Sequence, residues 1–319
     1  MGKSKTTSAV TEIFLCPGGL RQIVPPASWR GHLRRRACSI KSEFVFQRKY
    51  VRRNPMKHTV HRITTFLLCA FCLAPAALAQ DLDDILQAEL RPGWRTEDGI
   101  HMAALQLNMA PGWKTYWRQP GDSGIPPRFD FSQSVGVQAF EVFYPTPEIS
   151  WLGSSRNIGY EEQVIFPVQL SVDRAADITL IGRIEIGVCR ELCIPVTLDL
   201  SAQLSAQAPV DLLIKAARAA VPKPGAGQIT CAFSAADDGM ELKIVLPSPD
   251  RAFDNAAIEL DNPRLWVKTP KLELRDGRLN VTAQIMTPTG QPVAIGRDGV
   301  TTTLFAPDGA TEYRGCLGA

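Results

Sequence analysis

Cys189 and Cys193 are separated by three residues and lie between two stretches with the composition of β-strands. Residues 177–187 and 194–200 are rich in β-branched side chains and roughly alternate apolar with polar residues. A disulfide requires its Cα atoms to lie within about 7 Å, whereas an extended chain would hold these two roughly 13 Å apart. If the cysteines pair, the chain must therefore turn sharply between them, and the flanks favour the tip of a β-hairpin over a single helical turn.

A disulfide in such a short loop is expected to be exposed and somewhat strained. Both properties are typical of disulfides that exchange with other thiols. A bond that closes so few residues also restricts the unfolded chain little. The pattern therefore favours a redox-active pair, and an inert structural disulfide is the alternative.

The formal net charge of +3 is the sum of two unlike parts of the 319-residue chain. Residues 1–55 carry 12 Lys and Arg against 2 Asp and Glu, so their net charge is +10. Residues 80–319 carry 21 Lys and Arg against 30 Asp and Glu, so their net charge is −9. Because the excess of basic residues is confined to the first part, the composition gives no support for nucleic-acid binding.

Residues 56–79 have the parts of a secretory signal peptide. A short basic start precedes an apolar run at 63–73, and Ala77 and Ala79 supply small residues at the positions that signal peptidase reads. The apolar run is shorter than the ~20 residues that a spanning helix needs, which favours a signal peptide over a membrane anchor. We expect cleavage after Ala79, and no later stretch approaches membrane-spanning length. The mature chain is thus predicted to be exported to the periplasm.

Residues 1–55 stand before this signal, although a signal peptide belongs at the N-terminus. They contain scattered arginines and no periodic apolar pattern. We interpret Met56 as the true start, and residues 1–55 as an over-extended reading frame or a disordered leader.

Half of the eight cysteines fall in the leader and the signal peptide. An even number in the remaining, exported part suggests two disulfides. Of the three pairings, spacing favours Cys189 with Cys193 and Cys231 with Cys316. The second bond would close a loop of about 85 residues, for which chain entropy gives a stabilisation on the order of 4–5 kcal/mol. We interpret it as structural.

Residues 80–207 are predicted to form a β-sandwich, because short alternating runs are separated by turn residues. Residues 81–90 are expected to form a short helix or a lead-in strand. Residues 144–156 contain two prolines and are predicted to be a long loop. The predicted strands are 99–109, 113–119, 137–143, 162–170, the two runs beside the cysteines, and an edge segment at 125–131.

Residues 208–227 are predicted to join this sandwich to a second, smaller one at 228–319. The alanine-rich stretch 208–220 has Leu and Ile spaced for one face of a helix, and a linker rich in Pro and Gly follows at 221–227. The fold class is therefore all-β, with two sandwiches. The strands predicted in the second sandwich are 228–234, 240–246, 256–260, 264–268, 279–286 and 300–305.

Metal binding by the cysteine pair is the first rival to thiol exchange. A zinc site needs four ligands, and His101 is the single histidine between residues 80 and 319. The same part of the chain has no second closely spaced cysteine pair. We therefore predict no zinc site and no cofactor, and copper(I), which accepts thiolates at low coordination number, stays open.

Residues 121–124, Gly-Asp-Ser-Gly, resemble the nucleophile loop of trypsin-like proteases. His101 lies 22 residues before Ser123, which leaves no room for the two-barrel arrangement that brings a base to such a serine. We interpret the stretch as a polar turn. The aromatic cluster at 113–117 is interpreted as core or sheet surface rather than as a ligand site.

Three stretches resemble the N-terminal periplasmic domain of the DsbD and ScsB family of thiol:disulfide interchange proteins. They are the aromatic run 112–118, the strand 158–168 and the cysteine-containing segment 184–195, and the resemblance covers about residues 90–205. The family's best-known members place more residues between the two cysteines. We expect no stretch of residues 80–319 to form their membrane domain or their C-terminal thioredoxin domain.

The resemblance implies an immunoglobulin-like sandwich with a redox pair at Cys189 and Cys193. It implies a cap loop over the disulfide, here about 145–156, with Trp151 or Leu152 as the lid. It also implies two kinds of partner, namely a membrane-embedded electron donor of the DsbD/ScsB type and periplasmic thioredoxin-fold proteins that receive the electrons.

Two functional hypotheses follow. In the first, the chain is an exported thiol:disulfide interchange module in which Cys193 attacks the partner's disulfide and Cys189 resolves the mixed disulfide. Arg190 would help to stabilise a thiolate, and the candidates for proton handling are Tyr116, Glu148 and Tyr160. In the second, the chain is a non-catalytic periplasmic binding or assembly protein, related to copper, with two structural disulfides.

Overall fold

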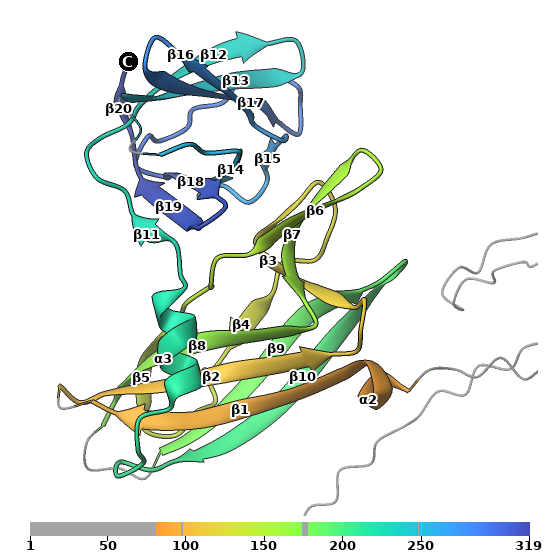
Figure 1. Ribbon diagram of the computed structural model, residues 1–319, viewed down its shortest axis with the longest axis vertical. Helices are drawn as coiled ribbons and strands as arrows, with labels where there is room; N and C mark the ends of the chain where they lie inside the picture. The colour runs from red at the N-terminus through yellow and green to blue at the C-terminus, as the bar shows by residue number, and fades with distance from the viewer. Residues whose placement is uncertain (1–80, 97, 174–177, 248, 250) are drawn as a thin grey trace, which may run out of the picture. The chain divides into compact units, whose positions relative to one another are not determined.

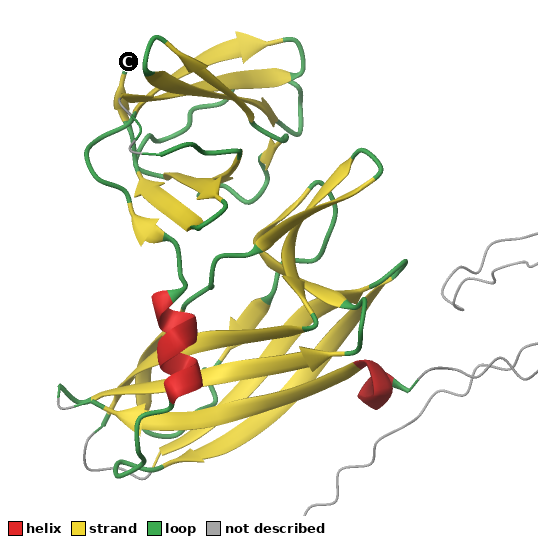
Figure 2. Cartoon of the chain, viewed as in Figure 1, coloured by secondary structure: helices red, strands yellow, loops and turns green. Residues whose placement is uncertain are grey.

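The computed structural model describes residues 81–96, 98–173, 178–247, 249 and 251–319. The predicted leader, the signal peptide and its cleavage site at Ala79 lie outside the described residues. Strands make up nearly all of the regular structure that is described, and the two helices, α2 (Leu82–Ile85) and α3 (Leu212–Ala219), are short (Figure 2). The predicted all-β fold class is confirmed.

The first sandwich begins with a four-stranded antiparallel sheet. Its central strands alternate apolar with smaller or polar residues and bury most of both faces, because one face contacts the other sheet and part of the other lies under α3. Residues 81–90 form both of the elements that the sequence left open, α2 followed by a strand. The sheet order is β1 (Leu86–Arg95), β2 (Ile100–Met109), β8 (Gln163–Val172), β5 (Val137–Val142).

The second sheet of this sandwich carries the cysteine pair. Its two longest strands, β9 and β10, form one hairpin of twelve-residue strands. β4 (Arg128–Asp130) pairs beside β9, off the main path of the sheet. The order, which can be followed in Figure 1, is β10 (Cys193–Leu204), β9 (Ile178–Cys189), β3 (Lys114–Gly121), β7 (Ser155–Glu161), β6 (Glu148–Leu152).

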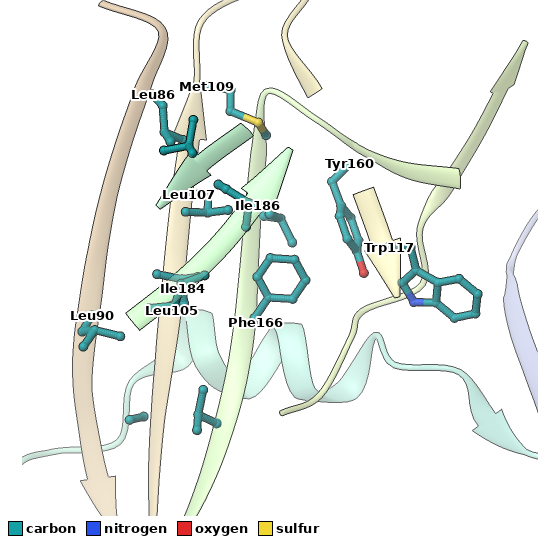
Figure 3. Packing of buried hydrophobic residues seen from close by; sticks show 14 of the residues in the cluster. Leu86, Leu90, Leu105, Leu107, Met109, Trp117, Tyr160, Phe166, Ile184 and Ile186 are labelled. Atoms are coloured by element: carbon teal, nitrogen blue, oxygen red, sulfur yellow. The ribbon is translucent and has the colours of Figure 1, made fainter. Parts of the chain in front are cut away.

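A continuous apolar core lies between these two sheets. Figure 3 shows Leu105 and Phe166 of the first sheet beside Ile184 and Ile186 of the second, and all four side chains are at most 1% exposed. Each fully buried side chain of this size contributes about 1.5–3 kcal/mol of transfer free energy. This core fixes β9, and with it the position of Cys189 at the end of the strand.

Residues 223–318 form the second sandwich, in which no strand is shared with the sheets of the first. It has its own apolar core, centred on fully buried residues such as Leu242, Val281 and Ile285. One sheet has the order β11 (Lys223–Pro224), β19 (Gly309–Arg314), β18 (Val300–Ala306), β14 (Asn255–Leu260). The other has the order β15 (Trp266–Val267), β17 (Arg278–Met286), β13 (Gly239–Pro247), β12 (Thr230–Ala236), β20 (Leu317–Gly318), with β16 (Lys271–Arg275) also on β17.

The region between the sandwiches contains the predicted helix, α3. The Asp211 carboxylate caps it by accepting hydrogen bonds from the backbone N–H groups of Leu213 and Ile214. Ile214 is fully buried and packs against Ala104 and Ile165 of the first sandwich. The predicted linker differs from the structure in one respect, because β11 at its centre pairs with β19. The domain boundaries at 207 and 227 stay a prediction.

Candidate functional site

Cys189 and Cys193 form a disulfide at the tip of the β9–β10 hairpin. The two residues face each other in the strand register, and their Cα atoms are 4.1 Å apart. The turn between them is closed by a hydrogen bond from the Arg190 N–H to the Leu192 carbonyl oxygen, 3.2 Å long. The hairpin tip that strand-like flanks predicted is therefore the observed arrangement.

The two sulfur-bearing residues differ in exposure. Cys189 is 2% exposed, whereas Cys193 lies on the exposed side of the tip. The neighbours of Cys193, Leu192 and Ile194, are also exposed, Leu192 to 81%. Another protein therefore reaches Cys193 before it reaches Cys189, and it meets an apolar surface there.

Tyr116, on β3, places its hydroxyl group next to the exposed sulfur. Its hydroxyl oxygen lies 3.3 Å from Sγ of Cys193, and the residue is 3% exposed. Burial raises the pKa of Tyr116 above its ordinary value, since an ionised phenolate would lose its hydration. The phenol therefore keeps its proton at neutral pH and can donate a hydrogen bond to a Cys193 thiolate.

β3 is held next to the cysteine hairpin by short-range contacts. Lys114 pairs with Cys189 in the sheet, and the buried Thr115 hydroxyl donates a 2.9 Å hydrogen bond to the Gly187 carbonyl oxygen. These contacts come from residues directly before Tyr116, so the backbone that carries the phenol is fixed to β9.

Arg190 lies in the turn between the cysteines, and its side chain is exposed. The centre of its guanidinium group is 5.6 Å from the centroid of the Trp113 ring. Within the described residues, no hydrogen bond or ion pair joins Arg190 to another side chain. The positive charge of Arg190 is therefore close to the disulfide in sequence. It is positioned by a cation–π contact with Trp113 rather than by an ion pair with a carboxylate.

Trp151 and Leu152 lie at the tip of a second hairpin, formed by β6 and β7. They are 55% and 67% exposed. The prediction of an irregular loop over 144–156 was wrong from residue 148 onward, because this stretch pairs with β7 despite the prolines that precede it. The role of Trp151 or Leu152 as a lid stays a prediction. We call residues 148–161 the cap hairpin.

Glu148 and Tyr160 lie at the base of the cap hairpin and line one small depression together with Tyr116. The Tyr160 hydroxyl donates a 2.8 Å hydrogen bond to the Pro145 carbonyl oxygen. Burial raises the pKa of Tyr160 well above its ordinary value. Of the two candidate tyrosines, the structure thus places the hydroxyl of Tyr116 against a sulfur and engages that of Tyr160 with the backbone.

Two further residues near the site were not among the sequence candidates. Gly124 packs against the Tyr116 ring, since a Cβ built on it would lie 2.5 Å from Cε1 of that ring. Asp122 accepts hydrogen bonds at both carboxylate oxygens. The sequence signal for both is the Gly-Asp-Ser-Gly stretch, which as a local motif predicts only a polar turn.

The second disulfide joins Cys231, on β12, to Cys316, just before β20. Cys231 is fully buried in the core of the second sandwich. The bond spans 85 residues of sequence and ties the end of the chain to β12, on which β20 pairs. This is the pairing that spacing favoured.

The described residues contain no group of three or more His, Cys, Asp and Glu side chains that could hold a metal ion. His101 is fully buried, and its Nε2 lies 2.6 Å from the Pro92 carbonyl oxygen. In the part of the chain that the structure describes, no helix is long and apolar enough to span a membrane.

A β-sandwich that presents one sulfur of a short-loop disulfide at an exposed hairpin tip has the features of a thiol–disulfide exchange domain. Comparison with family models indicates the same class of domain. Residues 84–205 match the family described as "Thiol:disulfide interchange protein DsbD, N-terminal". The matched residues are those of the first sandwich.

Comparison with solved structures extends the likeness beyond this domain. The chain is similar to the N-terminal periplasmic domain of ScsB from Proteus mirabilis, with a TM-score of 0.58 and 24% sequence identity. The match covers 76% of this chain and 96% of that one, whereas residues 84–205 are 122 of 319. At this level of identity the likeness shows a shared fold. No curated protein matches the chain.

Proposed function

We propose that the chain is a periplasmic thiol:disulfide interchange module. It receives reducing equivalents from a membrane-embedded donor of the DsbD/ScsB type and passes them, through Cys189 and Cys193, to thioredoxin-fold proteins of the periplasm. The observation that carries the proposal is the asymmetric disulfide, with Cys193 exposed beside a buried phenol and Cys189 buried behind it.

The chemistry begins with the reduced dithiol. The Cys193 thiolate attacks one sulfur of the partner's disulfide, a mixed disulfide forms, and the partner's other sulfur leaves as a thiolate. The Cys189 thiolate then attacks Sγ of Cys193, which re-forms the Cys189–Cys193 bond and releases the partner as a dithiol. Two electrons pass to the partner, and the membrane donor returns them by the reverse sequence of exchanges.

Exposure supports Cys193 as the attacking residue, because Cys189 is 2% exposed and offers a bulky disulfide partner little access. The Tyr116 phenol donates to the Cys193 thiolate and so favours the reactive form. Arg190 adds a positive charge in the same turn. The exposed Leu192 supplies an apolar contact surface for the partner.

The experiment that tests the proposal is a trap. Purified Cys189→Ser protein is reduced and mixed with an oxidised thioredoxin-fold protein from the periplasm. It keeps the attacking Cys193 and lacks the resolving thiol, so we expect a stable mixed disulfide, seen as a higher-mass band that reducing agent removes.

The matched control is Cys193→Ser, which keeps only the buried thiol and should give no adduct. An adduct with Cys193→Ser alone would reverse the roles of the two cysteines. If neither variant is trapped and the reduced wild-type protein transfers no thiols, the interchange function is rejected in favour of a structural disulfide. Stoichiometric copper(I) binding by that reduced protein would then support the binding-protein alternative.

A further inference from the structure

The turn formed by residues Gly121–Gly124 follows β3 and folds back so that Gly124 lies against the Tyr116 ring. An ideal Cβ on Gly124 would lie 2.5 Å from Cε1 and 2.6 Å from Cδ1 of Tyr116, nearer than real Cβ atoms come. Only glycine allows this approach, and its φ of +146° also disfavours other residues. The backbone of the turn therefore forms one wall of the space that the phenol occupies.

Asp122 fixes this turn on two sides. Its Oδ2 accepts a 2.8 Å hydrogen bond from the Arg156 backbone N–H, and its own N–H donates a 2.8 Å bond to the Arg156 carbonyl oxygen. Its Oδ1 accepts a 2.8 Å hydrogen bond from the hydroxyl of Thr269, in the second sandwich. One carboxylate thus joins the turn, the cap hairpin and the second sandwich.

Arg156 adds a second connection at the same place. Its side chain is 1% exposed, and its Nη1 donates a 2.7 Å hydrogen bond to the Ala256 carbonyl oxygen on β14 of the second sandwich. A buried charge of this kind is costly unless it is compensated, and the negative Asp122 offsets part of that cost.

The two residues of β3 that follow Tyr116 also contact the second sandwich. Trp117 is fully buried and meets the Phe305 ring of the second sandwich edge-on, with ring centroids 5.7 Å apart. The Arg118 guanidinium forms ion pairs with Glu259 and Glu312, also in the second sandwich. Burial alone would lower the pKa of Arg118, but the two carboxylates outweigh it and the pKa is raised.

We propose that Asp122 is a positioning residue, through which the second sandwich holds the Tyr116 phenol against Cys193. The residue touches neither sulfur; it acts through the Gly121–Gly124 turn and the tyrosine ring. The inference deepens the proposed function, on which it rests, by giving the second sandwich a role in setting the redox properties of the Cys189–Cys193 pair.

The test measures the equilibrium constant of the Cys189–Cys193 pair with glutathione, for which no protein partner is needed. Loss of the phenol's hydrogen bond in Tyr116→Phe should make the reduced form less stable by about tenfold, because hydrogen bonds to charged groups are the strong ones. Tenfold corresponds to about 30 mV for a two-electron couple. Asp122→Ala and Thr269→Val should shift the constant in the same direction, by about threefold to tenfold.

Two controls separate positioning from mere stability. Thr287→Val removes a threonine hydroxyl of the second sandwich whose hydrogen bond stays within that sandwich, to the Gln291 carbonyl oxygen. It should lower the melting temperature without moving the glutathione constant. In a Tyr116→Phe background, Asp122→Ala should cause no further shift, because the two residues act through one contact.

Two outcomes overturn the inference. One is an unchanged glutathione constant in Asp122→Ala and Thr269→Val; the other is an Asp122→Ala shift that persists in full when Tyr116 is already Phe. Because glutathione replaces the partner, either outcome leaves the trapping experiment standing. Conversely, if Cys189→Ser forms no adduct with the partner protein, the glutathione equilibrium constants still test the role of Asp122.

Discussion

The two disulfides of this chain differ in loop length and in the exposure of their more accessible cysteine. Cys189–Cys193 has a sequence separation of 4 and exposes Cys193 at the hairpin tip, whereas Cys231–Cys316 has a separation of 85 and joins a fully buried cysteine to a partly buried one. The first constrains a part of the chain that β9 and β10 already hold together. The second joins segments that are far apart in sequence, β12 and the chain end.

The difference teaches that loop length and exposure together separate a reactive disulfide from a structural one. Loop entropy makes the long-range bond stabilising, and its two cysteines are buried (Cys231) or partly buried (Cys316), whereas Cys193 is exposed. We expect the short-range bond to contribute less to the free energy of unfolding, and therefore to open while the sandwich stays folded. The following predictions test this contrast from the largest expected effect to the smallest.

Removing each disulfide in turn should have unequal effects on stability. We expect Cys231→Ala with Cys316→Ala to lower the free energy of unfolding by about 4–5 kcal/mol, and Cys189→Ala with Cys193→Ala by about 2 kcal/mol, from the dependence of chain entropy on loop length. Denaturant unfolding of both double variants measures the two values. An equal loss of unfolding free energy in the two double variants would contradict the proposed difference between the two disulfides.

Tyr116→Phe should alter the chemistry of one disulfide and leave the other unaffected. We expect about a tenfold change in the glutathione equilibrium of Cys189–Cys193 and no change for Cys231–Cys316. Tyr160→Phe is the matched control, because its hydroxyl bonds the Pro145 carbonyl oxygen. It should lower stability by about 1 kcal/mol and leave both equilibria alone. A larger redox effect from Tyr160→Phe would reassign the role of the phenol.

The Tyr116 phenol should keep its proton across the neutral range. Burial raises the pKa of Tyr116 above its ordinary value of 10.0, so the proton is fully retained below that value. The stability contributed by the buried neutral phenol is present there and is lost only as the pH rises through the raised pKa. The near-ultraviolet absorbance difference between wild-type and Tyr116→Phe protein, which reports ionisation of this phenol, should therefore be constant between about pH 6 and 8. A steep change within that interval would contradict a protonated phenol.

Arg190→Gln is expected to have the smallest effect. The guanidinium is exposed and held over Trp113, so its field at the sulfur is screened by solvent and salt. We expect the rate of thiol transfer from the reduced protein to fall by about twofold at low salt, and by less at high salt. Stopped-flow measurements at two ionic strengths provide the check. A salt-independent loss of more than about tenfold would instead indicate direct contact with the thiolate.

Much of the fold follows from local sequence pattern. The strand pattern predicted β2, β5 and β17 almost to their ends, and the capped alanine-rich stretch predicted α3. Two of the strands that the sequence did not predict, β16 and β20, have weak local signals. β16 is nearly all exposed, and β20 is two residues long, formed where the disulfide holds the chain end beside β12.

The site was predictable only in part, for a similar reason. The cysteine pair and the hairpin tip follow from spacing and from the flanking residues. The contacts of Asp122 do not, because Thr269 lies 147 residues away in sequence and Arg156 lies 34 away. Only the folded arrangement brings those groups to one carboxylate, so a local motif suggested a turn and nothing more.

The most direct measurement is the reduction potential of each disulfide in the same protein. Redox-buffer titration, followed by alkylation and mass spectrometry, reports Cys189–Cys193 and Cys231–Cys316 separately. We predict that Cys189–Cys193 is reduced at a potential above about −300 mV, in the range of exchanging disulfides, and that Cys231–Cys316 stays oxidised to below it. Reduction of Cys231–Cys316 first, or resistance of both bonds below about −300 mV, would contradict the account.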